Sequence, residues 1–231
     1  MASKKKYNFI IGIAVAFLLP LFSWFLFKNL SKGVVKIPGH YGMDYVDTFK
    51  DKDGKLQYDT VYRAVSDISL SNQLGNTVDL NRDLRGKILV INFIDTKGSA
   101  LSNTMMGNLH LLQQSYEKKG NLDWLQFVSI TVNPAQDNVL ALRHYADKFR
   151  VNHDHWWLLT GDSAAIYQYA QKDLLLQLNP LNQETEEPFN KVVLVDTFRH
   201  IRGYFNAVDT LELQRLADDI SILTMEKLKK K

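Results

Sequence analysis

Two apolar, β-branched runs with a helical pattern between them constrain the fold of this chain more than any other feature. The run KILVINFID covers residues 87–95, and LQFVSITV covers residues 125–132. Nearly continuous apolar character predicts strands that are buried on both faces, as parallel neighbours inside a sheet are. Between the runs, apolar residues recur at helical spacing: Leu101, Met105, Leu109, Leu112. This spacing predicts a helix over about residues 100–117.

The same alternation continues toward the C-terminus. Apolar spacing predicts a second helix over residues 136–149, and Asp162 is placed to cap a third helix over residues 163–172. Residues 192–196 read as another strand, and Asp209 opens a C-terminal helix. Strands alternating with helices predict an α/β sandwich.

A turn signal precedes this alternating region. Residues 50–65 read KDKDGKLQYDTVYRAV, in which Asp53-Gly54 is a typical hairpin turn between two short strands. The sequence therefore predicts a β-hairpin between the N-terminal segment and the globular domain.

An uncharged apolar run occupies residues 7–27, YNFIIGIAVAFLLPLFSWFLF. At about 1.5 Å per residue, roughly 21 helical residues reach about 31 Å, enough to cross a hydrocarbon core of about 30 Å. A cleaved signal peptide is the alternative, because three lysines precede the run. The run is longer than the apolar part of a usual signal peptide, and no small-x-small cleavage site follows it, so we favour a transmembrane anchor.

Charge and cysteine content exclude several functions. The formal net charge is +3, and seven lysines lie at the two ends: Lys4, Lys5, Lys6, Lys227, Lys229, Lys230, Lys231. Without those seven charges the remainder sums to 3 − 7 = −4, which argues against nucleic-acid binding. The chain contains no cysteine, so it supplies no thiol redox chemistry, iron–sulfur ligation or thiolate–metal bond.

No catalytic motif or small-molecule substrate can be identified. The patterns G-x-S-x-G, G-x-x-x-x-G-K-[ST] and G-x-G-x-x-G are all missing from the sequence. No nucleophile with a matching base can be named either. We therefore expect a protein that is not an enzyme and has no cofactor.

Five segments, in order, resemble the SCO/SenC family. They are SLSNQLGNTVDL (69–80), GKILVINFI (86–94), TVNPAQDNVLALRHYADKF (131–149), WWLLTGD (156–162) and VVLVDTFRHIRGYFNAVD (192–209). The similarity runs from about Asp59 to the C-terminus. This family comprises membrane-anchored copper chaperones that help to assemble cytochrome oxidase. The resemblance implies a thioredoxin-like α/β sandwich, here with an N-terminal β-hairpin extension and one N-terminal transmembrane helix.

The resemblance also implies where copper ligands would lie. In the family, a T-x-C-P-x-x-C-P-x-M segment follows the strand that matches FID, and its two thiolates bind copper together with a histidine before the LVD strand. Aligning Thr96 and Met105 with that pattern puts Gly98 and Ser102 at the cysteine positions, and counting back from the LVD strand puts Pro188 at the histidine position. All three ligands are replaced by residues that do not suit Cu(I).

Two other groups could substitute as soft-metal ligands. Met106 and His110 are four residues apart on one helical face, and Met105 adjoins them; His153 and His155 form an H-x-H pair. The simpler interpretation is that Met105 is a core residue, His110 is a surface residue, and the H-x-H pair lacks a third ligand. Both interpretations remain open at this point.

The expected layout has five parts: a cytoplasmic tail (1–6), a transmembrane helix (7–27), a connector and hairpin (28–58), an SCO/thioredoxin-like domain (59–226) and a basic tail (227–231). Lysines on both sides of the apolar run nearly balance, and the short tail is expected to stay in the cytoplasm. We therefore expect a single-pass protein of a bacterial inner membrane with its domain in the periplasm.

The functional hypothesis follows from a sequence that keeps the SCO/SenC motifs but has lost the copper ligands. We expect a non-enzymatic accessory or structural subunit, or an assembly scaffold, of an envelope complex such as a respiratory oxidase. Its partners would be a membrane protein complex and, through residues 7–27, the lipid bilayer. The alternative is a copper chaperone for cytochrome oxidase assembly that uses non-standard His and Met ligands.

Overall fold

The structure, a computed structural model, describes residues 16–25, 38–97, 100–120, 122–177 and 190–229. The chain divides into two units, Met1–Ile37 and Pro38–Lys231. In the first unit, residues 16–25 are helical. Across the described ranges, no helix combines the length and the apolar character needed to cross a membrane. The predicted transmembrane span over residues 7–27 extends beyond the described residues at both ends.

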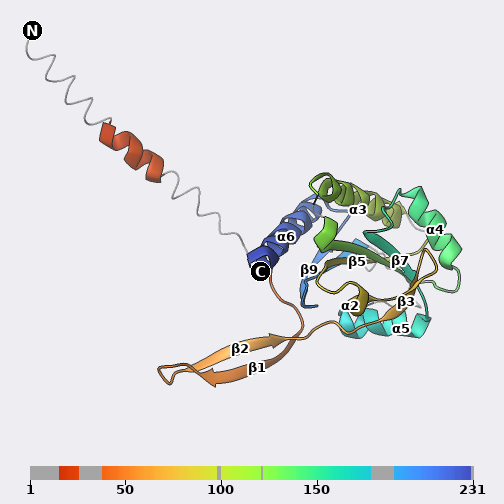
Figure 1. Cartoon of the computed structure of the whole chain (residues 1–231), viewed down its shortest axis with the longest axis horizontal. Helices are drawn as coiled ribbons and strands as arrows, with labels where there is room; N and C mark the ends of the chain where they lie inside the picture. The colour runs from red at the N-terminus through yellow and green to blue at the C-terminus, as the bar shows by residue number, and fades with distance from the viewer. Residues whose placement is uncertain (1–15, 26–37, 98–99, 121, 178–189, 230–231) are drawn as a thin grey trace, which may run out of the picture. The chain divides into compact units, whose positions relative to one another are not determined.

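The second unit is built on a seven-stranded mixed sheet (Figure 1). In chain order its strands are β3 (Ser69–Asn72), β4 (Thr77–Asp79), β5 (Ile88–Ile94), β6 (Leu125–Thr131), β7 (Trp156–Thr160), β8 (Lys191–Val195) and β9 (Ile201–Asn206). Their order in space is β4-β3-β7-β6-β5-β8-β9. The β5–β6 and β6–β7 pairs are parallel, and the other neighbours are antiparallel. Every residue of β5 and β6 is buried, as the apolar runs predict.

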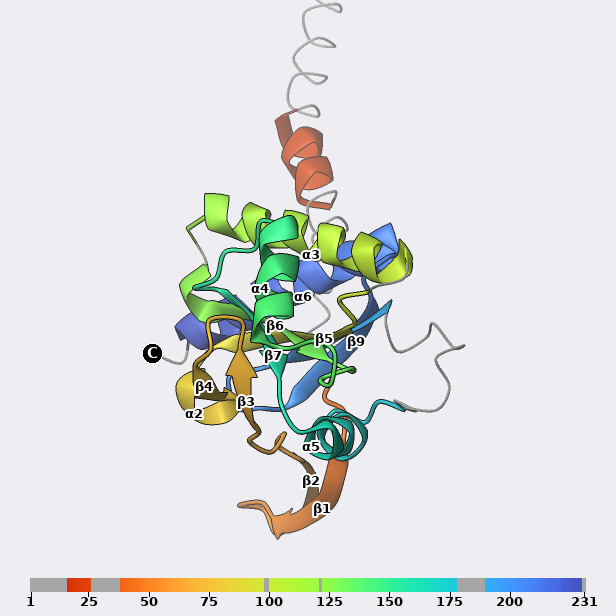
Figure 2. The ribbon, with the colours of Figure 1, turned by 90° about the vertical axis from the view of Figure 1, so that its right-hand side faces the viewer.

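Helices cover both faces of the sheet (Figure 2). They are α2 (Leu80–Asp83), α3 (Ala100–Lys118), α4 (Val139–Lys148), α5 (Ser163–Gln168) and α6 (Thr210–Lys229), with a short 3-10 turn η1 (Leu122–Trp124) and a π-helical turn η2 (Tyr169–Asp173). Ile88 and Val90 of β5 pack with residues of α3, α4 and α6. Leu89 and Ile91 point the other way and pack with residues of α2, α5 and η2. This period of two divides the interior into two apolar layers.

Local capping sets the beginnings of the helices. The Asp162 carboxylate accepts the N–H of Ala165 at 2.8 Å, so the predicted cap of the third helix is confirmed. The predicted start of the second helix at residue 136 is wrong. The Asn138 side chain accepts the N–H of Ala141 at 3.0 Å, and α4 starts after it, because the preceding residues form a turn closed by a bond from the N–H of Asp137 to the carbonyl of Asn133.

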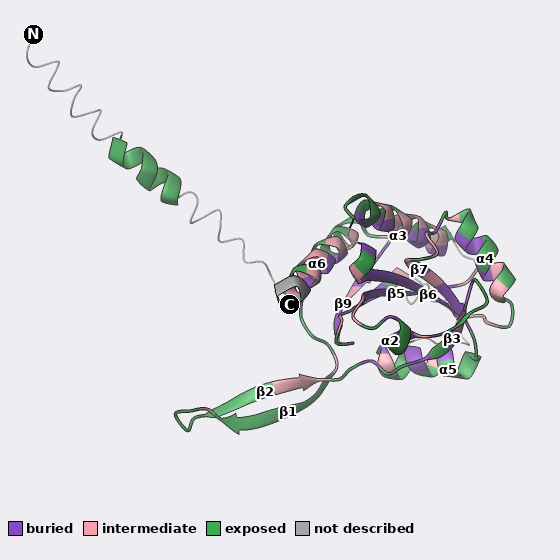
Figure 3. Ribbon diagram, in the orientation of Figure 1, coloured by how far each residue is buried: buried purple, intermediate pink, exposed green. Residues whose placement is uncertain are grey.

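The predicted hairpin is present as a separate two-stranded sheet. Strands β1 (Met43–Lys50) and β2 (Leu56–Tyr62) pair antiparallel, with Gly54 in the turn at φ +77°. The predicted boundary between residues 58 and 59 falls inside β2, since its pairing continues to Tyr62. All of β1 and the first half of β2 are exposed on both faces (Figure 3).

A buried arginine joins the β8–β9 turn to the beginning of β5. Arg199 has φ +70° and is 7% exposed. Its guanidinium donates to the carbonyl of Lys87 at 2.9 Å and to that of Leu84 at 2.6 Å. The Leu84 carbonyl also accepts the N–H of Lys87 at 3.0 Å, so the guanidinium is its second donor. One side chain thus ties the β8–β9 turn to the connection between α2 and β5.

We expect Arg199→Met to lower the free energy of unfolding by about 3–5 kcal/mol, because it keeps the apolar stem but removes the hydrogen bonds that the buried guanidinium donates to the carbonyls of Lys87 and Leu84. Urea unfolding of the full chain in detergent, followed by tryptophan fluorescence, measures the change. The exposed Arg143→Met is the control, with an expected change within about 0.5 kcal/mol. A loss at Arg199 no larger than that of the control would contradict this role.

Candidate functional site

The candidate site lies where the parallel strands β5 and β6 end. Carboxyl ends of parallel strands meet at one edge of a sheet, and loops there commonly hold ligands. Thr96 follows β5, and Ser102 lies in the first turns of α3, 2% exposed. Gly98 and Pro188, the other two predicted ligand positions, lie outside the described residues.

The centre of this site is a buried carboxylate. Asp137 is 0% exposed, and its oxygens accept the N–H of Thr96 at 3.2 Å, the hydroxyl of Thr96, and the hydroxyl of Thr131 at 2.5 Å. The Thr131 oxygen in turn accepts the N–H of Asn133 at 3.0 Å. Three neutral donors stabilise the carboxylate. These hydrogen bonds connect the loop after β5 to the turn before α4.

Ser102 faces the hydroxyl of Tyr145. Its Oγ lies 3.4 Å from the phenol oxygen of Tyr145. Burial raises the pKa of Tyr145 above its ordinary value; the contact with Ser102 opposes this, and the charges of Asp95 and Asp137 add to it. The phenol therefore stays protonated at neutral pH and does not activate Ser102 as a nucleophile. Sequence analysis missed Tyr145, because only the fold brings α4 against the start of α3.

Comparison with known proteins identifies the family. The family model described as SCO1/SenC matches residues 57–222. The chain belongs to the SCO1/SenC family. The SCO1 protein homolog of Bacillus subtilis (strain 168) is 29% identical over 120 residues, which are 52% of this chain and 61% of that protein. The match thus spans less than two thirds of that relative's length.

Solved structures of SCO proteins share the fold. BsSco, described as a member of the Sco family of cytochrome c oxidase assembly proteins, has a TM-score of 0.60 and 22% identity, covering 70% of this chain and 94% of that one. Copper-bound ScoI of Bradyrhizobium japonicum has a TM-score of 0.54 and 20% identity, covering 70% and 99%. The expected thioredoxin-like α/β fold is therefore confirmed.

The site described above does not suit the copper that the SCO1/SenC resemblance implies. Cu(I) is a soft ion that prefers thiolate, thioether and imidazole ligands. The groups that meet here are the hydroxyls of Ser102, Thr96, Thr131 and Tyr145 and the carboxylate of Asp137, all hard oxygen donors. The chain has no cysteine to add to them.

The methionines considered as alternative copper ligands lie in the apolar layer beneath α3. Met105 and Met106 are both 0% exposed; their sulfurs lie 3.9 Å from Asn92 Nδ2 and Ser129 Oγ, respectively. His110 is half-buried, and its Nδ1 atom has no hydrogen-bond partner. Burial lowers the pKa of His110, with Arg150 adding to the effect.

The H-x-H pair is divided between two environments. His153 Nδ1 lies 3.1 Å from Gln73 Nε2, and its Nε2 lies 3.3 Å from an Asp147 oxygen. His155 Nδ1 is buried without a partner. Within the described part of the chain, neither histidine nor His110 belongs to a group of three His, Asp or Glu side chains that could meet on one ion. A copper site on these residues stays a prediction.

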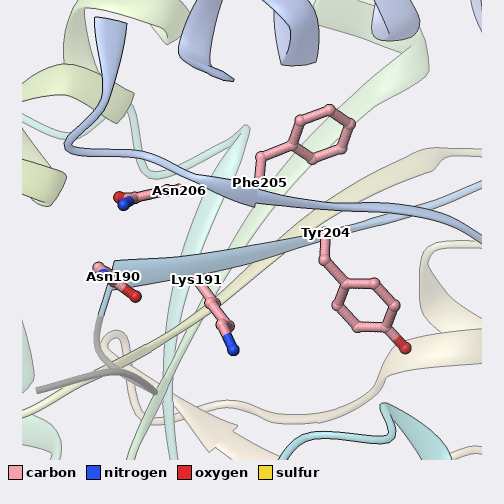
Figure 4. A pocket seen from close by; sticks show the side chains of 5 residues that line it. All are labelled: Asn190, Lys191, Tyr204, Phe205 and Asn206. Atoms are coloured by element: carbon pink, nitrogen blue, oxygen red, sulfur yellow. The ribbon is translucent and has the colours of Figure 1, made fainter. Parts of the chain in front are cut away.

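A small pocket opens at the start of β8, just after the segment that contains position 188. Figure 4 shows its lining: Asn190, Lys191, Tyr204, Phe205, Asn206. Burial, with a smaller contribution from Tyr41, raises the pKa of Tyr204 to about 12, and its hydroxyl donates to the carbonyl of Leu174 at 3.0 Å. The lining offers no acid–base pair, so the pocket carries no catalytic assignment.

We expect Asp137→Asn to lower the free energy of unfolding by about 2–4 kcal/mol, because an amide has one acceptor atom where the carboxylate has two. Urea unfolding of the full chain measures the loss. Asp162→Asn is the matched control, since asparagine caps a helix about as well as aspartate does. Equal, small losses in both variants would show that the Asp137 network does not stabilise the loop.

Proposed function

We propose that this SCO1/SenC protein is a membrane-anchored accessory or structural subunit, or an assembly scaffold, of an envelope complex, and that it is not an enzyme. The supporting observation is a complete SCO-like scaffold whose strand-end site is an oxygen network around Asp137 instead of a thiolate pair. Replacement of all three ligand positions, rather than one, favours a role without copper at this place.

A respiratory oxidase is the complex we propose first. BsSco is described as a member of a family of cytochrome c oxidase assembly proteins, and this chain shares its fold. An SCO-like protein that has lost its copper site can still bind the same kind of complex as its relatives, because binding uses the surface of the fold rather than the metal.

The proposed location is the periplasmic side of a bacterial inner membrane. The uncharged run over residues 7–27 is long enough to serve as a single transmembrane anchor. Residues 1–6 would form the cytoplasmic tail. The domain would then work within reach of other membrane proteins.

The hairpin supports an interaction role. Its large apolar side chains are about half exposed or more: Met43, Tyr45, Val46, Phe49, Leu56, Tyr58. A two-stranded hairpin exposed on both faces gains little from its own packing. Tyr45 and Phe49 lie on the same face of β1, about 14 Å apart along the strand with Asp47 between them, so one face of the hairpin offers two aromatic anchors to a partner.

We expect full-length protein extracted in mild detergent to co-purify with a defined membrane complex at a fixed stoichiometry. Tyr45→Ser/Phe49→Ser should reduce the recovered complex at least tenfold, because both aromatic anchors are lost. The control is Leu211→Ser, which removes an exposed apolar side chain from α6. Circular dichroism checks that each variant folds. A wild-type protein that purifies alone would refute the proposal.

Restoring the family ligands tests the loss of copper directly. We expect the wild type to yield Cu(I) to a competing chromophoric chelator, whereas Gly98→Cys/Ser102→Cys/Pro188→His retains one equivalent, because two thiolates and an imidazole suit Cu(I). Ser102→Cys alone is the control and should bind much more weakly. One tightly held copper in the wild type would instead support the chaperone with non-standard ligands.

A further inference from the structure

Three potential metal ligands meet at the opposite end of the sheet from the candidate site. His40 precedes β1, while Asp196 and His200 belong to the β8–β9 turn, and one ligand atom from each lies within 4.8 Å of the others. Val195 pairs with Leu89, near the beginning of β5, whereas the Asp137 network lies beyond its end. The sequence did not reveal this group, because His40 is far from the other two along the chain.

The turn holds Asp196 and His200 in fixed positions. One oxygen of Asp196 accepts the N–H groups of Phe198 and His200, both at 2.9 Å. The other oxygen accepts Arg202 Nη1 at 3.0 Å and lies 3.9 Å from His200 Nδ1. A carboxylate oxygen has two lone pairs, so this second oxygen can accept one more partner.

Contacts on three sides hold His40. Its ring stacks on Tyr62 with centroids 4.5 Å apart and stands edge-on to His200 at 5.7 Å. Arg202 donates to the carbonyl of Pro38 at 2.8 Å and to that of Gly39 at 3.1 Å. The backbone before β1 is therefore tied to β9 beside the second imidazole.

The local charge suits a cation despite the nearby arginine. Arg202 lies 3.0 Å from a carboxylate oxygen of Asp196 and 3.5 Å from one of Glu226, so two negative charges flank one positive charge.

We propose that His40, His200 and Asp196 form a binding site for a divalent cation of the zinc class. Two imidazoles and a carboxylate are a donor set that Zn²⁺ accepts, with solvent in the remaining position. Ligands about 2.0–2.1 Å from one ion lie roughly 3.3 Å apart, so ligand atoms that now lie within 4.8 Å of one another need to close by up to about 1.5 Å. His40 is exposed and His200 only partly buried, so both rings have room to turn.

Such an ion would cross-link two parts of the backbone. It would join the backbone that enters the domain at residues 38–41 to the turn between the last two strands, adding to the bonds that Arg202 already makes. This is a structural use of metal, separate from the SCO1/SenC cargo position at the other end of β5. The proposed accessory function does not depend on it.

Calorimetric titration of the full chain in detergent with Zn²⁺ tests the proposal, using a purification tag without histidines. We expect one saturable equivalent, and at least a tenfold loss of affinity in His40→Ala and in His200→Ala. The control is His144→Ala on the exposed side of α4, which should bind like the wild type. Thermal unfolding without metal checks that the variants fold. Added Zn²⁺ should raise the melting temperature of the wild type and of His144→Ala, but not that of His40→Ala or His200→Ala.

Co²⁺ gives a second measurement, because its visible absorption reports the number and geometry of its ligands. A tetrahedral or five-coordinate spectrum is expected for the wild type, lost in His40→Ala/His200→Ala. Unchanged Zn²⁺ affinity in that double variant, or no saturable binding by the wild type, would overturn the proposal.

Discussion

The complete burial of β5 and β6 is the constraint on which the rest of this structure depends. Both strands are covered on both faces, so a polar side chain within them has to find its partner inside the protein. The Ser129 hydroxyl donates to Asn92 Oδ1 at 2.7 Å and accepts Trp156 Nε1–H at 2.8 Å, which links β5, β6 and β7 through one buried chain. Hydrogen bonds of this kind are specific to one register, so they fix how the strands pair as well as satisfying the polar atoms.

The same requirement shapes the strand ends, and it explains how an SCO1/SenC fold remains intact without cysteines. The loop after β5 has no thiolate–metal bonds to hold it. Thr96, at the start of this loop, is bound through both backbone and side chain to Asp137, which also accepts the hydroxyl of Thr131. The network therefore stabilises the loop, whereas the lack of thiolate ligands follows from the lack of cysteine in the chain.

Sequence reasoning succeeded where the determining interactions are local. Periodicity located β5, β6 and α3, and the side-chain cap at Asp162 located α5, since both signals involve residues a few positions apart. It failed where the partner is distant. The start of α4 depended on a competing turn, and nothing local marks Tyr145 as the neighbour of Ser102 or Arg199 as the donor for α2 and β5. Alignment to family motifs assigned Ser102 to a copper-ligand position. Motifs do not describe which contacts a residue makes once the copper ligands are lost.

The two ends of the central sheet differ in what they leave available. At the carboxyl end of β5, Asp137 accepts three hydrogen bonds from neutral donors. Among the described residues it belongs to no group of three potential metal ligands. At the other end, Asp196 is also buried and paired, but Glu226 adds a second negative charge beside Arg202, and two imidazoles face the remaining lone pair. Surplus negative charge together with two imidazole nitrogens is what distinguishes a metal site from a satisfied ion pair. Those ligands connect two backbone segments of the domain. An ion bound there would therefore stabilise the domain and would not be transferred to a partner protein.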